Sequence, residues 1–237
     1  MISAFFEESI VKRAQEAKQV KIEIIDLREF GKAQYGSVDD RPYGGGAGMV
    51  MRVDVLYEAL NKVEIGKSKV VLTSAKGKLF NQDKAQEYLK CKHLVLICGH
   101  YEGVDERVLE YVDEEVSLGD FVMTGGEIAA CAIVDSVVRL IPGVLKKEEA
   151  TQLESFFTVS TDKLIKIIGQ NKLLTNLMKK GVKDVRLLEY PHYTRPEKFK
   201  EKKVPDVLLQ GNHKEIEKWR LTMAYEETVQ KRPDLLK

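Results

Sequence analysis

Apolar and polar positions follow two different periods along the first two thirds of the chain. Helical spacing and strand-like alternation replace each other every 10 to 15 residues or so, a rhythm typical of βαβ units. The predicted elements are helices at 3–17, 54–63, 81–91 and 125–141, and strands at 20–27, 69–73 and 93–98. This order predicts an α/β domain with a mostly parallel sheet.

The last third of the chain has a different pattern. Residues 158–190 are rich in lysine and carry apolar pairs at a spacing that predicts one or two amphipathic helices, interrupted near Gly169 and capped near Gly181. A final helix is predicted from His213, behind Asn212 as its cap, to Lys231. We therefore expect a mostly helical C-terminal part, with a boundary near residues 150–160.

Composition narrows the class of protein. The 237 residues are 43% hydrophobic and 32% charged, which excludes a disordered chain and a fibrous repeat. No apolar run reaches the ~18 residues that span a bilayer. Three cysteines, Cys91, Cys98 and Cys131, form no close pair and argue against a disulfide framework or a zinc site. We expect a soluble protein of a reducing cytoplasm, without membrane association.

The net charge of +1 hides an asymmetry between the two parts. Residues 1–157 hold 20 Lys and Arg against 26 Asp and Glu, whereas residues 158–237 hold 18 against 11. A basic C-terminal part favours a polyanionic partner, although a solvated lysine-rich surface explains the same count.

Three loops carry the candidate chemistry. The first, DDRPYGGGAGM at 39–49, offers backbone amides to an anion but lacks the spacing of a phosphate loop, and a flexible hairpin tip is equally compatible. The second, GHYEGVDER at 99–107, follows a buried strand, where open α/β sheets bind ligands, although an ordinary connection fits too. The third, SLGDFVMTGGE at 117–127, holds a short apolar strand and enters a helix. Together the last two predict a pocket that suits an adenosine-type cofactor better than a metal.

These loops, followed by RLIPGVL and YPHYTRP, resemble the TrmD family of bacterial tRNA (guanine-N1)-methyltransferases, of the SPOUT class. The resemblance covers most of residues 20–157 and 190–237. It implies an α/β fold with a C-terminal trefoil knot, followed by a small helical domain. It also implies a homodimer that uses S-adenosylmethionine, assisted by Mg²⁺, to methylate N1 of guanosine 37 in tRNA; no DNA or membrane partner is expected. The implied domains are a knotted S-adenosylmethionine-binding domain at 1–157, an extended helical linker or insertion at 158–190, and a helical tRNA-binding domain at 191–237.

The resemblance also assigns site residues by matching motifs. The implied substrate-binding residues are Asp40, Tyr43, Gly44, Gly45, Gly46, His192, Tyr193 and Arg195. The implied cofactor-binding residues are Thr73, Ser74, Gly99, Tyr101, Glu102, Gly103, Ser117, Leu118, Gly119, Asp120, Phe121, Val122, Met123, Gly125 and Gly126.

Arg139 and Glu154 match the family's catalytic pair. Guanine N1 carries a proton at neutral pH, so methylation needs a base near N1. Negative charge then moves to O6, where a guanidinium can donate charge-assisted hydrogen bonds. Taken singly, Arg139 is also explained as a charge at a helix C-terminus, and Glu154 as a solvated linker acid.

The chain departs from the family pattern at several places. His100 stands where an arginine is usual, and Glu154 where an aspartate is usual. The segment 158–190 is longer than the expected linker, and a short strand is expected ahead of the first residues. Two other functions stay open: a non-catalytic RNA-binding module, and a related SPOUT methyltransferase that acts on another RNA.

Overall fold

The computed structural model describes residues 2–31, 36–63, 66, 68–146 and 154–237. The chain divides into two compact units, Met1–Lys147 and Glu148–Lys237, and each has its own hydrophobic core. This division lies ten residues before the predicted domain limit at residue 157.

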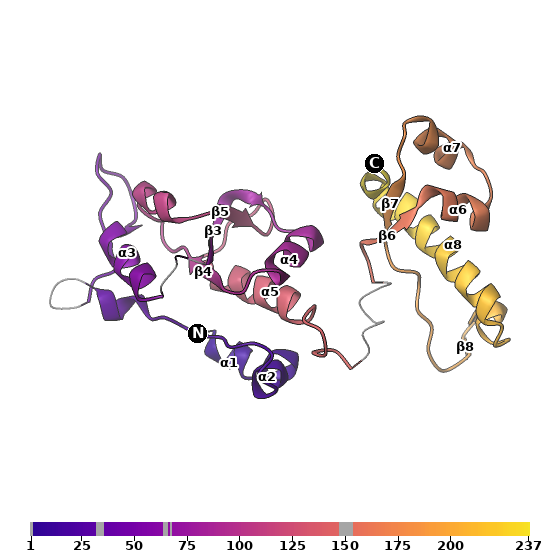
Figure 1. Ribbon diagram of the computed structural model, residues 1–237, viewed down its shortest axis with the longest axis horizontal. Helices are drawn as coiled ribbons and strands as arrows, with labels where there is room; N and C mark the ends of the chain where they lie inside the picture. Colours follow the sequence, from indigo (N-terminus) through magenta and orange to yellow (C-terminus); the bar gives the residue numbers. More distant parts are fainter. Residues whose placement is uncertain (1, 32–35, 64–65, 67, 147–153) are drawn as a thin grey trace. The chain divides into compact units, whose positions relative to one another are not determined.

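The first unit is built on a three-stranded parallel sheet (Figure 1). Its strands are β3 (Lys69–Leu79), β4 (Leu94–Cys98) and β5 (Glu114–Ser117), in the order β4-β3-β5. The register aligns Val71 of β3 with Leu96 on one side and Glu114 on the other. The α/β class and the parallel sheet are as predicted. Strand β5 differs from its prediction: it ends at Ser117, where SLGDFVMTGGE begins, whereas the apolar pattern predicted a strand within that segment.

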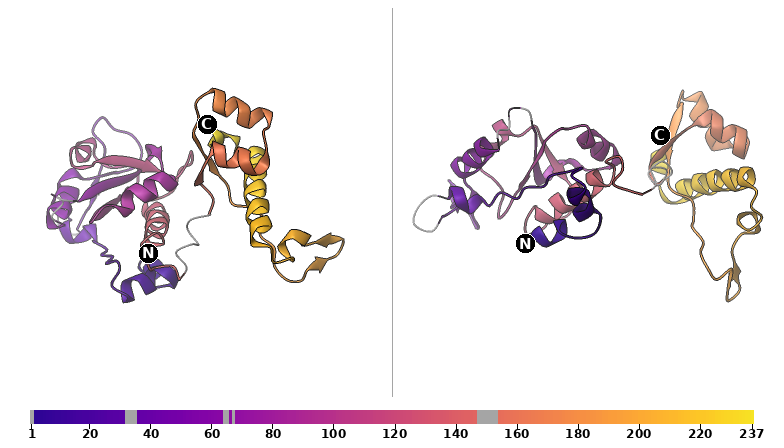
Figure 2. Two further views of the ribbon diagram at one scale, coloured as in Figure 1. Left: turned by 45° about the vertical axis from the view of Figure 1, so that its right-hand side comes forward. Right: turned by 60° about the horizontal axis from the view of Figure 1, so that its bottom comes forward.

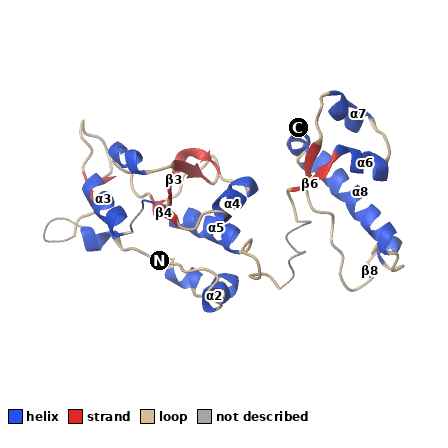
Figure 3. Cartoon of the chain, viewed as in Figure 1, coloured by secondary structure: helices blue, strands red, loops and turns tan. Residues whose placement is uncertain are grey.

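Helices cover both faces of this sheet, as the colouring by secondary structure makes plain (Figure 3). On one face, Val71 and Val116 pack with side chains of α4 (Gln82–Leu89) and α5 (Glu127–Val138). On the other face, alternate strand residues pack against α3 (Val53–Lys62). The apolar strands are therefore buried from two sides, as parallel strands require.

The N-terminal segment differs from its prediction. The single helix predicted over 3–17 is two helices, α1 (Ser3–Phe6) and α2 (Ser9–Glu16), because Glu8 is extended and Ser9 has a φ of 54°. Residues 20–26 form no paired strand among the described residues, although alternation predicted one. The chain then enters a short 3-10 helix whose cap, Asp26, accepts a hydrogen bond from the Arg28 amide at 2.9 Å.

The second unit combines helices with a small antiparallel sheet. Strands β6 (Phe157–Ser160) and β7 (Asp184–Leu187) pair, and α6 (Thr161–Ile168) and α7 (Lys172–Lys179) lie between them in the chain. The long helix α8 (His213–Lys231) packs against α6. A short hairpin of β8 (Lys198–Phe199) and β9 (Lys202–Lys203) stands away from these elements (Figure 2).

Polar caps set the limits of these helices. Ser160 Oγ accepts from the Lys163 amide at 3.2 Å and begins α6, which ends at Gly169 with a φ of 87°. Asn171 Oδ1 accepts from the Leu174 amide at 2.9 Å and begins α7. The two helices interrupted near Gly169 are as predicted, and so is α8 behind Asn212.

Residues 158–190 are an integral part of the second unit. Leu164, Leu174 and Leu187 are fully buried in one cluster that also contains Leu221 and Ala224 of α8. Six of the ten buried residues that this cluster holds in the described part of the chain come from the segment 158–190. The unit is also not purely helical, since β6 and β7 tie its helices together.

Within the described part of the chain, no helix is both long and apolar enough to cross a membrane.

Candidate cofactor pocket and substrate loops

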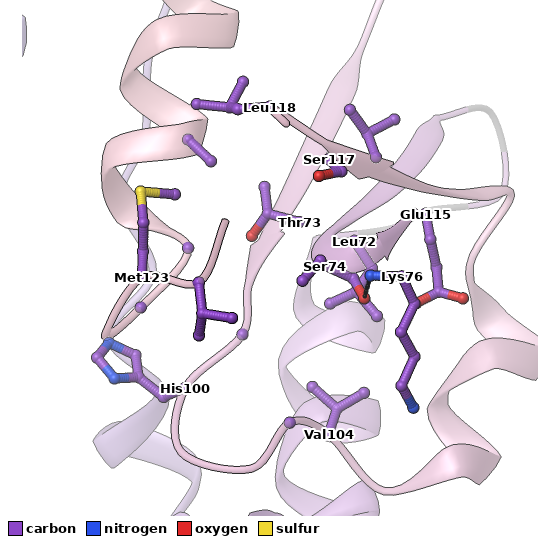
Figure 4. A pocket seen from close by; sticks show the side chains of 18 of the residues that line it. Leu72, Thr73, Ser74, Lys76, His100, Val104, Glu115, Ser117, Leu118 and Met123 are labelled. Atoms are coloured by element: carbon purple, nitrogen blue, oxygen red, sulfur yellow. Dashed lines mark hydrogen bonds between the residues drawn. The ribbon is translucent and has the colours of Figure 1, made fainter. Parts of the chain in front are cut away.

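A cavity of about 300 Å³ opens at the carboxyl ends of the parallel strands. Its lining comes mainly from three segments: 72–76 of β3, residues 99–104 and Glu106 after β4, and residues 115–119 and 121–126 between β5 and the start of α5. Parallel strands end at a common edge, which is why loops distant in sequence meet there. Figure 4 shows Thr73 and Ser117 pointing into the same space from neighbouring strands, with His100 on one side and Lys76 and Glu115 on the other. The cavity is of the size that holds a small ligand.

The structure brings together nearly all residues for which a cofactor role was predicted. Asp120 is the exception: it is exposed and does not line the cavity. The predicted residues that line it are Thr73, Ser74, Gly99, Tyr101, Glu102, Gly103, Ser117, Leu118, Gly119, Phe121, Val122, Met123, Gly125 and Gly126.

Two loops of the cavity touch through glycine backbone. The Gly126 amide donates to the Gly99 carbonyl at 2.8 Å. A Cβ on Gly126 would overlap Thr73 Oγ1 and lie 2.9 Å from the Gly99 nitrogen. Thr73 is buried and its hydroxyl donates to the Ile97 carbonyl at 3.0 Å. Only glycine therefore fits at position 126, and the close approach leaves backbone groups at the cavity wall.

The far end of the second loop is fixed by an ion pair. The Arg107 guanidinium donates to both carboxylate oxygens of Asp105, at 2.9 and 2.7 Å. This hydrogen bonding holds the pKa of Asp105 below its usual range. The same carboxylate accepts from the Arg107 amide and begins the 3-10 helix Glu106–Tyr111. Asp105 and Arg107 of the GHYEGVDER motif thus fix the conformation of the end of this loop.

Other residues of the cavity were not predicted. Lys76, Glu106 and Glu115 line it, and so does His100, which the sequence analysis noted only as a departure. His100 Nε2 lies 2.5 Å from Glu127 Oε1 in the first turn of α5. The one signal in the sequence that points to this contact is Glu127 at a helix N-terminus, where an acid complements the helix dipole.

The lining of the cavity is mixed in character. Glycines and apolar side chains of the third loop line it, and so do three acids and one lysine: Glu102, Glu106, Glu115 and Lys76. Burial raises the pKa of Cys98, below the second loop, to about 12, so this thiol stays protonated and is no nucleophile at neutral pH. Among the described residues, no group of three or more His, Cys, Asp or Glu side chains can hold a metal ion.

The predicted substrate loop lies beside the cofactor loop. It spans β1 (Asp39–Asp40) and β2 (Val50–Met51), which pair antiparallel. The Glu102 amide donates to the Met49 carbonyl at 3.1 Å, and the Met51 amide donates to the Gly103 carbonyl at 3.0 Å. A side chain at Gly48 would collide with the Glu102 carboxylate. The loop is thus joined to the cavity through its second strand.

The tip of this loop faces solvent. Tyr43 is 100% exposed, and Gly44, Gly45 and Gly46 all have positive φ angles. Asp40 lies at its base, 3.8 Å from the Arg52 guanidinium. Packing does not explain an exposed aromatic ring on a glycine-rich tip, whereas contact with a substrate does.

The remaining predicted residues lie in different units. Arg139 ends α5 in the first unit, whereas Glu154 belongs to the second, where its carbonyl accepts from the Phe157 amide at 3.1 Å. The other three predicted substrate residues are exposed on the second unit. His192 pairs with Glu189 at 2.7 Å, Tyr193 lies against Trp219, and Arg195 follows.

Fold and cavity together define an α/β protein with a small-ligand site at the carboxyl edge of a parallel sheet. Comparison with known proteins sharpens this class. The chain belongs to the tRNA (Guanine-1)-methyltransferase TrmD family, whose model matches residues 1–237.

Relatives of known name agree with the family match. The chain is 44% identical over 237 residues to the tRNA (guanine-N(1)-)-methyltransferase of Mycoplasma mycoides, an alignment that covers 100% of this chain and 87% of the relative. It is 44% identical to the protein of that name from Clostridium tetani, covering 98% of this chain and 86% of the relative. The protein of that name from Listeria monocytogenes is 43% identical over 100% of this chain and 88% of its own length. The family match includes residues 158–190, so it gives no support to an insertion there.

Proposed function

We propose that this protein transfers a methyl group from S-adenosylmethionine to N1 of guanosine 37 in tRNA. The observation that carries the proposal is the cavity: loops assigned to a cofactor from motifs alone meet around one space, in a chain that matches the TrmD family throughout. When bound, S-adenosylmethionine supplies an electrophilic methyl group on a positively charged sulfur.

The residues of the cavity fit this cofactor. Backbone amides and carbonyls of the loop 99–103 and of residues 118–123 are the groups proposed to hold the adenine and ribose. The close contact of Gly126 with Gly99 leaves no room for a side chain at position 126. Three acids, Glu102, Glu106 and Glu115, line the cavity against one lysine, Lys76, and this excess of negative charge favours a cationic ligand.

The two proposed catalytic residues have complementary tasks. Glu154 accepts the proton of guanine N1, and the freed electron pair of N1 attacks the methyl carbon. The carbon–sulfur bond breaks at the same time, its electron pair stays on the sulfur, and S-adenosylhomocysteine leaves. Arg139 donates hydrogen bonds to O6, where negative charge accumulates as the proton leaves. Glu154 is one methylene longer than the usual aspartate, so its reach toward N1 differs slightly.

The loop 41–49 is proposed to receive the target guanosine. Its attachment to Glu102 and Gly103 supports this role, because the methyl donor and the acceptor base must be adjacent. The residues proposed to contact substrate are Asp40, Tyr43, Gly44, Gly45, Gly46, His192, Tyr193 and Arg195.

The proposal extends to fold and assembly. The proposed fold includes a deep trefoil knot, for which the family match and the close contact of two loops are the support: His100 forms an isolated bridge with Gly125, and the Gly126 amide donates to the Gly99 carbonyl. A homodimer is supported by apolar side chains that stay exposed near the cavity: Phe121 at 54%, Val122 at 88% and Ile128 at 63%. The tRNA substrate would place the enzyme in the cytoplasm.

No step is assigned to Mg²⁺. The described residues form no cluster of acids or histidines that suits a divalent ion, and the proton transfer above needs none.

The proposal is tested by methyl transfer to unmodified tRNA transcripts from cofactor labelled in its methyl group. A transcript with guanosine at position 37 should accept label, and a matched transcript with adenosine there should not. Equal labelling of both transcripts, or of neither, would refute the proposed substrate position.

A further inference from the structure

Five side chains form a cluster on the second unit, and the proposed function gives a role to only two of them, His192 and Tyr193. The ring of Tyr190 is its centre, with the ring of His192 at 4.7 Å, the ring of Trp219 at 6.5 Å and the guanidinium carbon of Arg220 at 5.0 Å. The ring of Tyr193 lies 6.2 Å from that of Trp219. We call this cluster the aromatic platform.

The platform has a firm base and an open outer side. Tyr190 packs against the core of the second unit, and Trp219 is half-buried on the regular helix α8. By contrast, Tyr193 keeps 48% of its surface in water, and His192 and Arg220 are exposed. Tyr190 and Trp219 would be enough to fasten the loop to α8, so packing leaves the exposed outer residues unexplained.

Positive charge continues from the platform along the chain. The hairpin of β8 and β9 begins five residues after Tyr193 and carries Lys198, Lys200, Lys202 and Lys203, all exposed. Among the described contacts, one carboxylate is hydrogen-bonded to a platform residue: Glu189 pairs with His192. An exposed aromatic surface that leads into a lysine hairpin combines the two features by which proteins bind unpaired nucleic acid.

We propose that the aromatic platform stacks on an unpaired base of the tRNA anticodon loop, while the hairpin lysines contact phosphates of the same strand. This inference rests on the proposed function, because it takes tRNA as the substrate. It adds Tyr190, Trp219 and Arg220 to the residues that contact RNA. The partner is single-stranded RNA, since a base inside a duplex has no free face for a ring.

Trp219 provides a direct probe, because it is the only tryptophan of the chain. The fluorescence of the full-length protein is titrated with an unmodified anticodon stem-loop RNA, and in parallel with a fully paired RNA duplex of the same length. Stacking on the platform predicts quenching by the stem-loop and little change with the duplex. Equal changes with both RNAs, or none with either, would overturn the proposal.

Substitutions at Tyr193 separate stacking from packing. Tyr193→Leu keeps apolar contact with Trp219 but has no aromatic face, so affinity for the stem-loop should fall about 5- to 100-fold, the usual effect of one lost stacking partner. Tyr193→Phe should retain the affinity. Met178→Ala, on α7 and with a similar exposure of 46%, is the matched control and should also retain it. If Tyr193→Leu bound as tightly as Tyr193→Phe, the platform would be only a structural clamp.

Failure of this inference is distinguishable from failure of the proposed function. Stem-loop affinity of Tyr193→Leu tests the platform, whereas methyl transfer by the unmodified protein to the transcript with guanosine at position 37 tests the function. Normal affinity in Tyr193→Leu, together with methyl transfer by the unmodified protein, would reject the platform and leave the function intact. Weakened affinity in Tyr193→Leu, together with that methyl transfer, supports both.

Discussion

His100 Nε2 lies 2.5 Å from Glu127 Oε1 and so joins the loop after β4 to the first turn of α5. Both side chains are partly buried, at 35% and 22% exposure. The His100 amide also donates to Met51 Sδ at 3.2 Å, next to the base of the substrate loop. A side chain on Gly125 would collide with both partners. His100 thus holds the loop 99–104 against α5 on one side and against β2 on the other.

Removing this contact should loosen the cofactor loop. For His100→Ala we expect cofactor affinity to fall about 3- to 10-fold, the effect of one hydrogen bond of ordinary strength. His100→Arg, which places the family's usual residue there, should retain most of the affinity. His93→Ala is the control, because His93 also makes one side-chain hydrogen bond, to Ser68 at 2.7 Å, but lies outside the cavity. Calorimetric titration with S-adenosylhomocysteine measures all three variants; unchanged affinity in His100→Ala would contradict the role given to this contact.

The core role of residues 158–190 predicts a large effect at Leu174. Its side chain is fully buried, so Leu174→Ala should lower the free energy of unfolding by about 2–5 kcal/mol. Leu173→Ala, next in the chain but 37% exposed, should cost less than about 1 kcal/mol. Denaturant unfolding followed by Trp219 fluorescence reports on this unit. If Leu174→Ala left the midpoint of this unfolding transition unchanged, the segment would be a dispensable linker.

Local signals explain what could be predicted of the fold. Helix α8 follows from Asn212 as a cap and from helical spacing, both of which lie within a few residues. Strand pairing is not local. Residues 20–26 alternate as a strand does but have no paired neighbour among the described residues, and β6 pairs with β7 across the two helices between them.

The same distinction applies to the site. Gly99, Gly125 and Gly126 were predictable, because a glycine directly after a strand or before a helix in an α/β sheet is typical of a ligand-binding loop. The contact of His100 with Glu127 joins residues 27 positions apart, and no spacing rule connects them. The platform residue Trp219 was likewise hidden, because an apolar position on α8 is first explained by packing.

Acid should weaken the first unit through Glu114. Burial alone would raise the pKa of this carboxyl, but hydrogen bonds from Lys84 and Tyr88, at 2.7 and 3.0 Å, and the charges of Lys69 and Lys84 outweigh it and lower the pKa. A lowered folded-state pKa means that the stabilisation is complete above the ordinary value of 4.5 and is lost as pH falls through the folded value.

Glu114→Gln should therefore reduce stability at pH 7 by about 1–3 kcal/mol and flatten the loss of stability below pH 4.5. Glu23→Gln is the control, since its exposed pair with Lys21 contributes little. Unfolding followed by circular dichroism at a series of pH values gives both profiles. A Glu114→Gln profile parallel to that of the unmodified protein would rule out this source of the pH dependence.

The proposed base makes a separate kinetic prediction. Glu154→Gln keeps shape and hydrogen bonding but cannot take the N1 proton, so methyl transfer should slow by ~10²–10⁴-fold. Glu154→Asp, with the family's usual residue, should retain much of the activity. Arg139→Lys should also slow the reaction, because an ammonium lacks the planar fork of a guanidinium. Single-turnover transfer with saturating enzyme and cofactor removes binding from the rate; an unchanged rate in Glu154→Gln would exclude it as the base.

The central claim concerns which atom of which nucleotide receives the methyl group. The direct measurement is mass spectrometry of nucleosides and of mapped fragments, after unmodified tRNA has been incubated with the protein and S-adenosylmethionine labelled in its methyl group. Our account predicts one labelled product, 1-methylguanosine, in the fragment that contains position 37. A labelled ribose, a different methylated base or a label elsewhere in the tRNA would contradict it.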